Sequence, residues 1–167
     1  IEAMKELMIN FLHAAQKFIG KIMKQSNKIW KPLKLIALDD KDLSIFSDCI
    51  YQAILVSSEI NYDNEKKIFS LALERFTWEI AQGKDYNLKQ VLSILTIKGV
   101  EKIDAKNIFF NNLIYNVLSI SNVENNILIL LNDKKIINLT VNSWKCFLED
   151  VGKPRHPPVT PSHLKND

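Results

Sequence analysis

The residue types that most often carry catalysis or bind metals are sparse in this chain of 167 residues. The chain has three histidines, at His13, His156 and His163, and the last two lie in the proline-rich tail. A metal site needs several such ligands close together, and a nucleophilic triad needs a histidine beside its serine or cysteine. Neither spacing is present, so we expect no metal, no other cofactor and no catalytic residue. The sequence predicts that the protein is not an enzyme.

One acidic group has the spacing of paired carboxylates. Asp39, Asp40 and Asp42 stand almost side by side before an apolar segment. Aspartates also begin helices, because their carboxylates accept hydrogen bonds from the free N–H groups of the first turn. We therefore interpret this group as a helix start rather than as an acid–base site.

Cysteine and glycine usage narrows the class of protein further. Cys49 and Cys146 both lie in apolar segments, which indicates reduced thiols and a cytoplasmic protein rather than a disulfide scaffold. The four glycines stand singly, so no glycine-rich loop is available to bind a phosphate. We find neither a signal peptide nor a transmembrane segment in the sequence.

A row of lysines near the start of the chain raises the question of nucleic-acid binding. Lys17, Lys21, Lys24 and Lys28 recur at helical spacing. The net charge is only +3, and such rows are usually solvated helix faces. We keep nucleic-acid binding as a weak alternative and expect no nucleic-acid partner.

The most apolar stretch of the chain runs over residues 103–120. No charged residue falls between Lys106 and Glu124, and apolar residues cover more than one face of a helix drawn through this stretch. A helix that is apolar on most sides is buried in a bundle or in a membrane, and the asparagines of this stretch disfavour the membrane. We expect a buried central helix over residues 104–119.

Other segments show apolar residues at helical intervals around this stretch. We expect helices over residues 3–30, 42–58, 123–131 and 141–151, with two shorter ones that end at Gly83 and Gly99. For residues 127–141 the alternative is a β-hairpin that turns at residues 132–135. The predicted fold is all-α, a bundle of seven or eight helices. We expect one helical domain over residues 1–152 and a proline-rich tail over residues 153–167.

Three segments resemble the homology regions of the Bcl family of apoptosis regulators. Residues 90–100 read Gln-Val-Leu-Ser-Ile-Leu-Thr-Ile-Lys-Gly-Val, similar to the lead-in to the first region. Residues 144–152, which begin at a tryptophan and end at a glycine, are similar to the second region. Residues 53–59, followed by 66–70, look like a degenerate third region. The divergence is typical of fast-evolving or viral members.

The resemblance implies a regulator of apoptosis, pro-survival as the first choice, that binds amphipathic helices of pro-apoptotic Bcl-family proteins. Family motifs carried onto this chain give a hydrophobic surface groove lined by Tyr62, Phe69, Leu73, Val91, Leu95, Gly99, Lys106 and Phe109. The family's groove arginine is missing after Gly99, and Lys106 or Lys102 would supply the positive charge. The family's site at the mitochondrial outer membrane would require an anchor beyond residue 167. The resemblance leaves homodimer formation open. The competing class is a helical adaptor or chaperone-like module unrelated to apoptosis.

Overall fold

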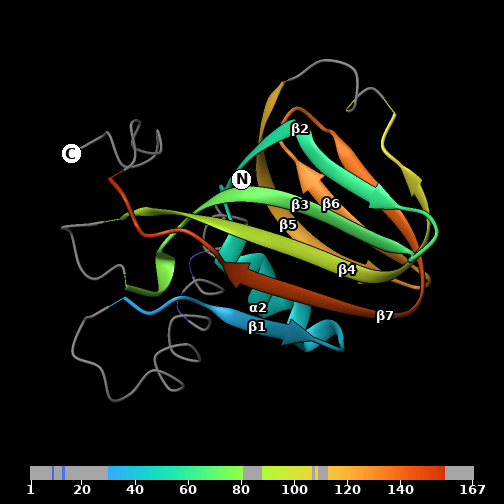
Figure 1. Cartoon of the computed structure of the whole chain (residues 1–167), viewed down its shortest axis with the longest axis horizontal. Helices are drawn as coiled ribbons and strands as arrows, with labels where there is room; N and C mark the ends of the chain where they lie inside the picture. The colour runs from blue at the N-terminus through green and yellow to red at the C-terminus, as the bar shows by residue number, and fades with distance from the viewer. Residues whose placement is uncertain are drawn as a thin grey trace.

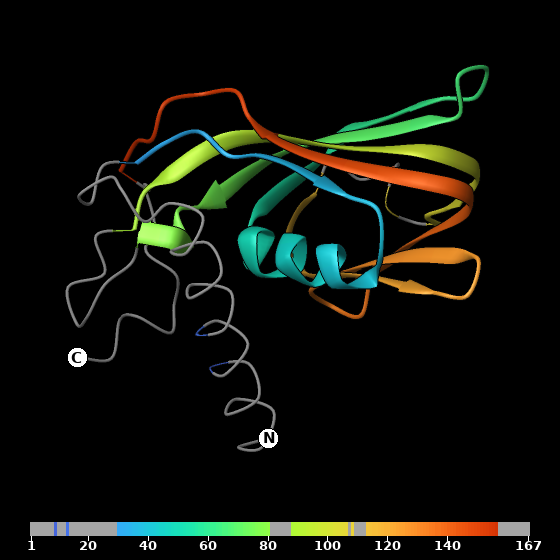
Figure 2. The same ribbon diagram turned by 90° about the horizontal axis from the view of Figure 1, so that it is seen from below.

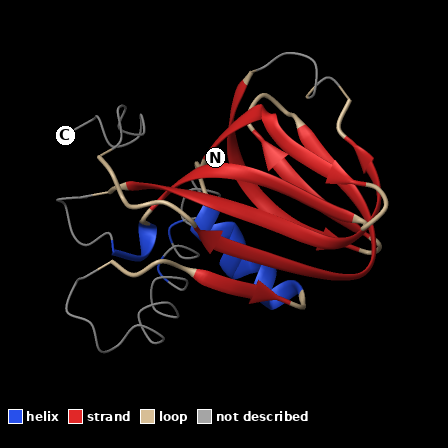
Figure 3. Ribbon diagram, viewed as in Figure 1, coloured by secondary structure: helices blue, strands red, loops and turns tan. Residues whose placement is uncertain are grey.

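The protein is built mainly from antiparallel β-strands (Figures 1 and 3). The structure, a computed structural model, describes residues 30–80, 88–106 and 113–156 together with Ile9, His13 and Ile108. Its elements are β1 (Lys34–Ala37), α2 (Asp40–Ile50), β2 (Ile54–Asp63), β3 (Ile68–Phe76), the 3-10 turn η1 (Trp78–Ile80), β4 (Gln90–Asp104), β5 (Ile114–Val123), β6 (Asn126–Leu131) and β7 (Ile136–Asp150).

The strands of the described residues close into a barrel. Their order is β1-β7-β4-β3-β2-β5-β6, and β6 pairs in turn with β7. This last pairing joins the last strand of the series to the second, so the ring β7-β4-β3-β2-β5-β6 has no open end, while β1 is an added strand on β7. Closing a sheet removes the exposed edges that an open sheet would present to solvent.

Alternation of side chains along each strand builds the interior. In β6, the buried residues Ile127, Ile129 and Leu131 alternate with partly exposed ones, as the two-residue period of a strand requires. The inward residues of the other strands join them in one continuous core, which the fully buried Phe69 and Ile97 exemplify. A small barrel of this kind is filled by side chains rather than hollow.

The helix α2 covers the side of the barrel between β1 and β5 (Figure 2). Its buried residues, which include Leu43 and Phe46, belong to the same core as the strands. Asp39 caps the helix by accepting a hydrogen bond of 2.9 Å from the backbone N–H of Asp42. The predicted helix start at the acidic group is therefore confirmed. The helix ends at Ile50, and the second half of the predicted helix 42–58 is strand β2.

The all-α prediction is wrong. The predicted central helix 104–119 comprises the end of β4, a connection and the first half of β5. The segments 123–131 and 141–151, also predicted as helices, lie mainly in β6 and β7. The physical reason is that several strands carry apolar residues on both faces, so their two-residue alternation is hidden and a helix with a broad apolar face fits equally well.

The exposure of individual residues also contradicts the predicted central helix. Leu113, expected at the centre of a buried helix, has 47% of its surface exposed, while Val117 is fully buried because it points into the barrel. The hairpin alternative for residues 127–141 is confirmed, since β6 and β7 pair antiparallel with Leu130 opposite Ile136. The predicted helix over residues 3–30 lies largely outside the described residues. No helix within the described part of the chain has the length and apolar character needed to span a membrane.

A half-buried carboxylate on α2 predicts a pH dependence of stability. Burial raises the pKa of Asp48 from 3.8 to about 6. The folded protein therefore binds the proton of the Asp48 carboxyl more tightly than the unfolded chain does. The protonated carboxyl contributes to the free energy of unfolding, and this contribution is lost as the pH rises from about 4 through about 6. Asp48→Asn mimics the protonated group. We expect this variant to gain stability relative to the wild type between pH 4 and pH 7.5, measured by urea unfolding.

The control for this experiment is Asp104→Asn, which removes one carboxylate at an exposed position of β4. Its difference from the wild type should change less between the two pH values. A constant difference for Asp48→Asn would show that the helix does not desolvate this carboxylate.

Candidate functional site

The strand β7 changes its neighbour halfway along one edge. Its first half pairs with β6, where Thr140 lies opposite Asn126, and its second half pairs with β1, where Cys146 lies opposite Ala37. Between these two ladders, no residue of β6 or β1 is registered opposite residues 142–144. The barrel wall therefore has a break between the start of β6 and the end of β1.

The other edge of β7 is irregular at the same point. Lys98 of β4 pairs with Lys145, but Val100 pairs with Val141. Between these two pairs, β7 therefore has two more residues than β4. A bulge of this kind bends the strand and re-aims its side chains, and bulges are frequent beside functional sites. Residues 142–144 are thus outside regular pairing on both edges.

Gly99 of β4 makes the bulge sterically feasible. Its φ is +87°, and a Cβ atom placed there would lie 2.5 Å from the backbone oxygen of Asn142. The backbones of β4 and β7 therefore approach so closely that the position requires glycine. Gly99, predicted to line a surface groove, instead lets β7 bulge.

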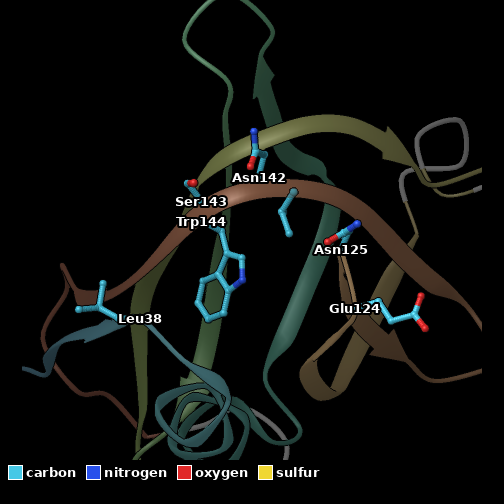
Figure 4. Close-up of a pocket in the computed structure, with 7 residues that line it drawn as sticks. Leu38, Glu124, Asn125, Asn142, Ser143 and Trp144 are labelled. Carbon is cyan, nitrogen blue, oxygen red and sulfur yellow. The ribbon is translucent and has the colours of Figure 1, made fainter.

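A pocket of about 290 Å³ opens at this break (Figure 4). Its lining residues come from the end of β1, the β5–β6 turn and the bulge of β7: Leu38, Glu124, Asn125, Val141, Asn142, Ser143 and Trp144. Figure 4 shows the Trp144 ring projecting from β7, with Leu38 on one side and Asn125 and Glu124 on the other. Four of the seven lining residues are polar, so this is a polar pocket with one aromatic ring.

Two of the lining residues have strained backbones. Glu124 has a φ of +54° and Ser143 a φ of +48°. Glu124 is the first residue of the two-residue turn between β5 and β6, in which Val123 lies opposite Asn126. Positive φ at that position is usual for glycine, asparagine or aspartate, because other side chains clash with their own backbone there. Non-glycine residues in such conformations cluster at functional sites.

The entry to α2 fixes the β1 side of the pocket. The backbone N–H of Leu38 donates a hydrogen bond of 2.9 Å to the carboxylate of Asp42. The side-chain amide of Asn122, near the end of β5, donates to Asp40 over 3.1 Å. These bonds tie the end of β1, the start of α2 and the β5–β6 hairpin together, so both walls of the pocket are held in place.

Charge is distributed unevenly around the pocket. Glu124 is its one charged lining residue, and the lining contains no lysine, arginine or histidine. The nearby Lys145 belongs to the opposite face of β7, because it precedes the buried Cys146 in the strand alternation. On that outer face Lys98 lies 5.1 Å from the ring centre of Phe147. The pocket therefore carries a negative charge that no lining residue neutralises.

A second polar cluster, around Arg75, is buried and has a structural role. Arg75 is fully buried, and its guanidinium donates to Asp150, to Glu79 and to the backbone oxygen of Phe76 over 2.7–3.0 Å. Asp150 also accepts a hydrogen bond of 2.8 Å from the backbone N–H of Leu33. The cluster thus joins β3, η1 and β7 to the residue before β1, and it holds β1 against β7 beside the pocket.

The electrostatics of this cluster keep it charged. Burial alone would lower the pKa of Arg75, but its hydrogen bonds to Asp150 and Glu79 raise it above the ordinary value. Ser93 donates a further hydrogen bond of 2.6 Å to Asp150. Every N–H direction of the guanidinium is engaged and the side chains are inaccessible, so the cluster offers no open position to a ligand.

The two cysteines and the acidic residues offer no alternative centre among the described residues. Cys49 and Cys146 are free and buried, as expected for reduced thiols, and burial raises the pKa of each to about 12. Thiols of this kind are poor nucleophiles at neutral pH. The described residues contain no group of three or more histidine, cysteine, aspartate or glutamate side chains that could hold a metal ion.

The residues predicted to line a groove lie mostly inside the barrel. Phe69, Leu73, Val91 and Leu95 are buried in β3 and β4, and all of these but Val91 belong to the main core cluster. Tyr62 of β2 is half-buried and donates a hydrogen bond of 2.7 Å to the backbone oxygen of Val100. Lys106 is exposed after β4, Lys102 is exposed on β4, and Phe109 lies outside the described residues. A hydrophobic surface groove does not form from the described members of this set, because their apolar side chains fill the barrel.

The fold and the pocket define the class: an antiparallel β-barrel protein with a helix on one side and an open polar pocket at a break between strands. The chain belongs to the family described as "Protein of unknown function (DUF2948)", whose sequence profile matches residues 33–163. No curated protein and no solved structure matches the chain.

The resemblance to the Bcl family is therefore wrong. The three segments that suggested it lie mainly in strands: 90–100 in β4, 144–152 at the end of β7, and 53–59 in β2. A helix-groove regulator of apoptosis needs a helical bundle, which this barrel excludes. The pro-survival role, the mitochondrial site and the viral origin rested on that resemblance and lose their basis. The alternative of a helical adaptor fails on the same observation, since the described residues are mostly strand.

The strain at Glu124 predicts an inverted response to substitution. Alanine retains the clash of a positive φ, whereas glycine removes it, so we expect Glu124→Gly to be more stable than Glu124→Ala by about 1 kcal/mol. Glu101 is an exposed strand residue without a positive φ. There the alanine variant should be more stable than the glycine variant, by about 0.5–1 kcal/mol. Urea unfolding of the four variants measures both differences. The same order at both positions would show that the β5–β6 turn is unstrained.

Proposed function

We propose that this protein is a non-catalytic binding protein and that its binding site is the pocket around Trp144. One observation carries the proposal: the barrel wall breaks where residues 142–144 of β7 have no registered partner, and the pocket at this break is lined by an aromatic ring and two strained residues. The strain at Glu124 and Ser143 persists although glycine would relieve it. Retaining these side chains at a cost in stability is what selection for binding would produce.

The shape of the pocket supports binding over catalysis. Glu124 is the titratable side chain of the lining, and the one hydroxyl there, that of Ser143, has no histidine or lysine in the lining to activate it. General acid–base or nucleophilic catalysis needs at least two groups with different roles held in contact. A partly buried aromatic ring with amides and one carboxylate matches the composition of recognition sites, in which a rigid ring provides contact area and polar groups provide direction.

A fragment screen tests this function directly. Ligand-observed NMR is run on a mixed library of small polar and aromatic fragments, with the wild type and with Asn125→Lys. Asn125 is exposed in the β5–β6 turn, so the longer, charged side chain should obstruct the pocket without disturbing the core. We expect a subset of fragments to bind the wild type and to lose binding in this variant.

The matched control is Asn61→Lys, an equivalent change at an exposed position of β2. It should leave fragment binding unchanged. Fragments that bind all three proteins equally would place the binding surface elsewhere, and a wild type that binds no fragment would contradict the proposed function. The expectation that nucleic acid does not bind stays a prediction.

A further inference from the structure

Building on the proposed binding function, we propose that the pocket recognises a cation, the guanidinium group of an arginine side chain presented by a polypeptide. This inference concerns the chemistry of the ligand, which the binding proposal leaves open. Three features of the pocket carry it: its charge, its aromatic ring and the strand edge that borders it.

The charge of the lining favours a cation. Glu124 forms no hydrogen bond or salt bridge within the part of the chain that the structure describes, and the lining holds no basic residue to offset it. Asp39 and Asp40 follow Leu38 directly and add negative charge beside it, with Lys41 as a partial offset. An anionic ligand would meet this carboxylate without a partner, whereas a cation would pair with it.

The start of α2 does not reverse this preference. A helix N-terminus attracts anions through its free N–H groups and its dipole. Here the Asp39 carboxylate already accepts from the N–H of Asp42, and the Asp42 carboxylate accepts from the N–H of Leu38. The N–H groups at this helix end are thus occupied by carboxylates of the same chain. The charge of Glu124 therefore determines the sign of the ligand's charge.

The ring of Trp144 favours a flat cation. Figure 4 shows the ring standing between Leu38 and the pair Asn125 and Glu124. A guanidinium is planar, stacks on an indole face and offers five N–H donors, which suits the partly buried ring and the amide of Asn125 beside it, whereas the carboxylate of Glu124 points away from the ring in Figure 4 and supplies the charge of the lining. An ammonium group is compact and cannot make the stacked and forked contacts together.

The setting of the pocket favours a polypeptide as the carrier. Residues 142–144 of β7 have no registered partner in the gap between the ends of β6 and β1, so their backbone N–H and C=O groups can bond to the backbone of a short peptide there. The volume of about 290 Å³ is at the lower limit of small-molecule pockets, and it suits one side chain rather than a larger organic ligand.

The test compares matched ligands by calorimetric titration. The probes are an acetylated and amidated Ala-Arg-Ala peptide, the same peptide with citrulline, the same peptide with lysine, and methylguanidinium. Citrulline has the shape of arginine without its charge. We expect the arginine peptide to bind about tenfold or more tightly than the citrulline peptide, and more tightly than the lysine peptide and methylguanidinium.

Variants link the effect to the pocket. Glu124→Gln removes the charge and keeps the shape, and we expect it to weaken the arginine peptide about tenfold while leaving the citrulline peptide nearly unchanged. Glu65→Gln, the same change at an exposed turn on the β2–β3 hairpin, should have no effect.

The outcomes separate this inference from the binding function. Equal binding of the arginine and citrulline peptides, or no effect of Glu124→Gln, overturns the cation inference. If methylguanidinium binds as tightly as the arginine peptide, the polypeptide carrier is wrong. Fragments that bind only when Asn125 is intact would still support the pocket as a binding site in either case.

Discussion

Replacing Arg75 by methionine is expected to lower the free energy of unfolding by about 3–5 kcal/mol, the largest effect of any single substitution considered. The change removes the cation of a buried cluster and leaves the carboxylates of Glu79 and Asp150, at 0% side-chain exposure, without a positive charge; Asp150 keeps only its hydrogen bonds from the Leu33 N–H and the Ser93 hydroxyl. Buried charges without partners are costly because the interior cannot replace their hydration. Urea unfolding monitored by circular dichroism gives the value.

Arg155→Met is the matched control for this prediction. Arg155 forms a salt bridge of the same length, 2.7 Å, with Glu74, but 63% of its side chain is exposed. Solvent screening makes such surface pairs nearly neutral, so the loss should be below about 1 kcal/mol. Similar losses for both variants would show that burial does not distinguish the two ion pairs, and the structural role of the Arg75 cluster would be wrong.

Gly99→Ala is expected to cost about 2 kcal/mol or more. The φ of +87° is unfavourable for alanine, and the new Cβ would lie 2.5 Å from the backbone oxygen of Asn142, which cannot move aside as a side chain would. The substitution should also disturb the pocket, since the close approach at Gly99 supports the β7 bulge. Thermal and urea unfolding measure the loss.

Gly152→Ala provides the comparison. Its Cβ would lie 3.2 Å from the side chain of Leu92, and its φ is outside the left-handed region, so the cost should stay below about 1 kcal/mol. A Gly99→Ala variant as stable as the wild type would contradict the close contact between β4 and β7.

Local signals in the sequence predicted only part of the fold. The acidic group before α2 predicted the helix start because capping depends on residues adjacent in sequence. The hairpin at residues 132–135 was recognised as an alternative for the same reason. Barrel closure also depends on pairing between distant segments, such as β2 with β5 and β4 with β7, and no local pattern records it. The apolar outer residues Leu118 and Leu128 obscured the alternation that would have indicated strands.

The pocket could not be predicted because its residues come from three separate elements. The sequence places Trp144 in a predicted helix over residues 141–151, and it predicts a helix over residues 123–131 because Ser121 and Glu124 fit a capping box. A usable signal was present: residues 124–126 read Glu-Asn-Asn between two apolar runs, as a hairpin turn would. Recognising that turn still would not have placed it beside the β7 bulge, which requires the register of the barrel.

Ligand binding at the pocket around Trp144 can be tested with one NMR spectrum. The chain has three tryptophans, and ¹⁵N labelling of their indoles gives one N–H signal each; Trp144→Phe identifies the signal of the pocket. Trp78 serves as an internal reference, because it is buried and its indole N–H donates to the backbone oxygen of Tyr51 over 2.8 Å. We predict that the arginine peptide, or a fragment found in the screen, shifts the Trp144 signal in a saturable way and leaves the Trp78 signal in place. Saturable binding that leaves the Trp144 signal unmoved would contradict binding at this pocket.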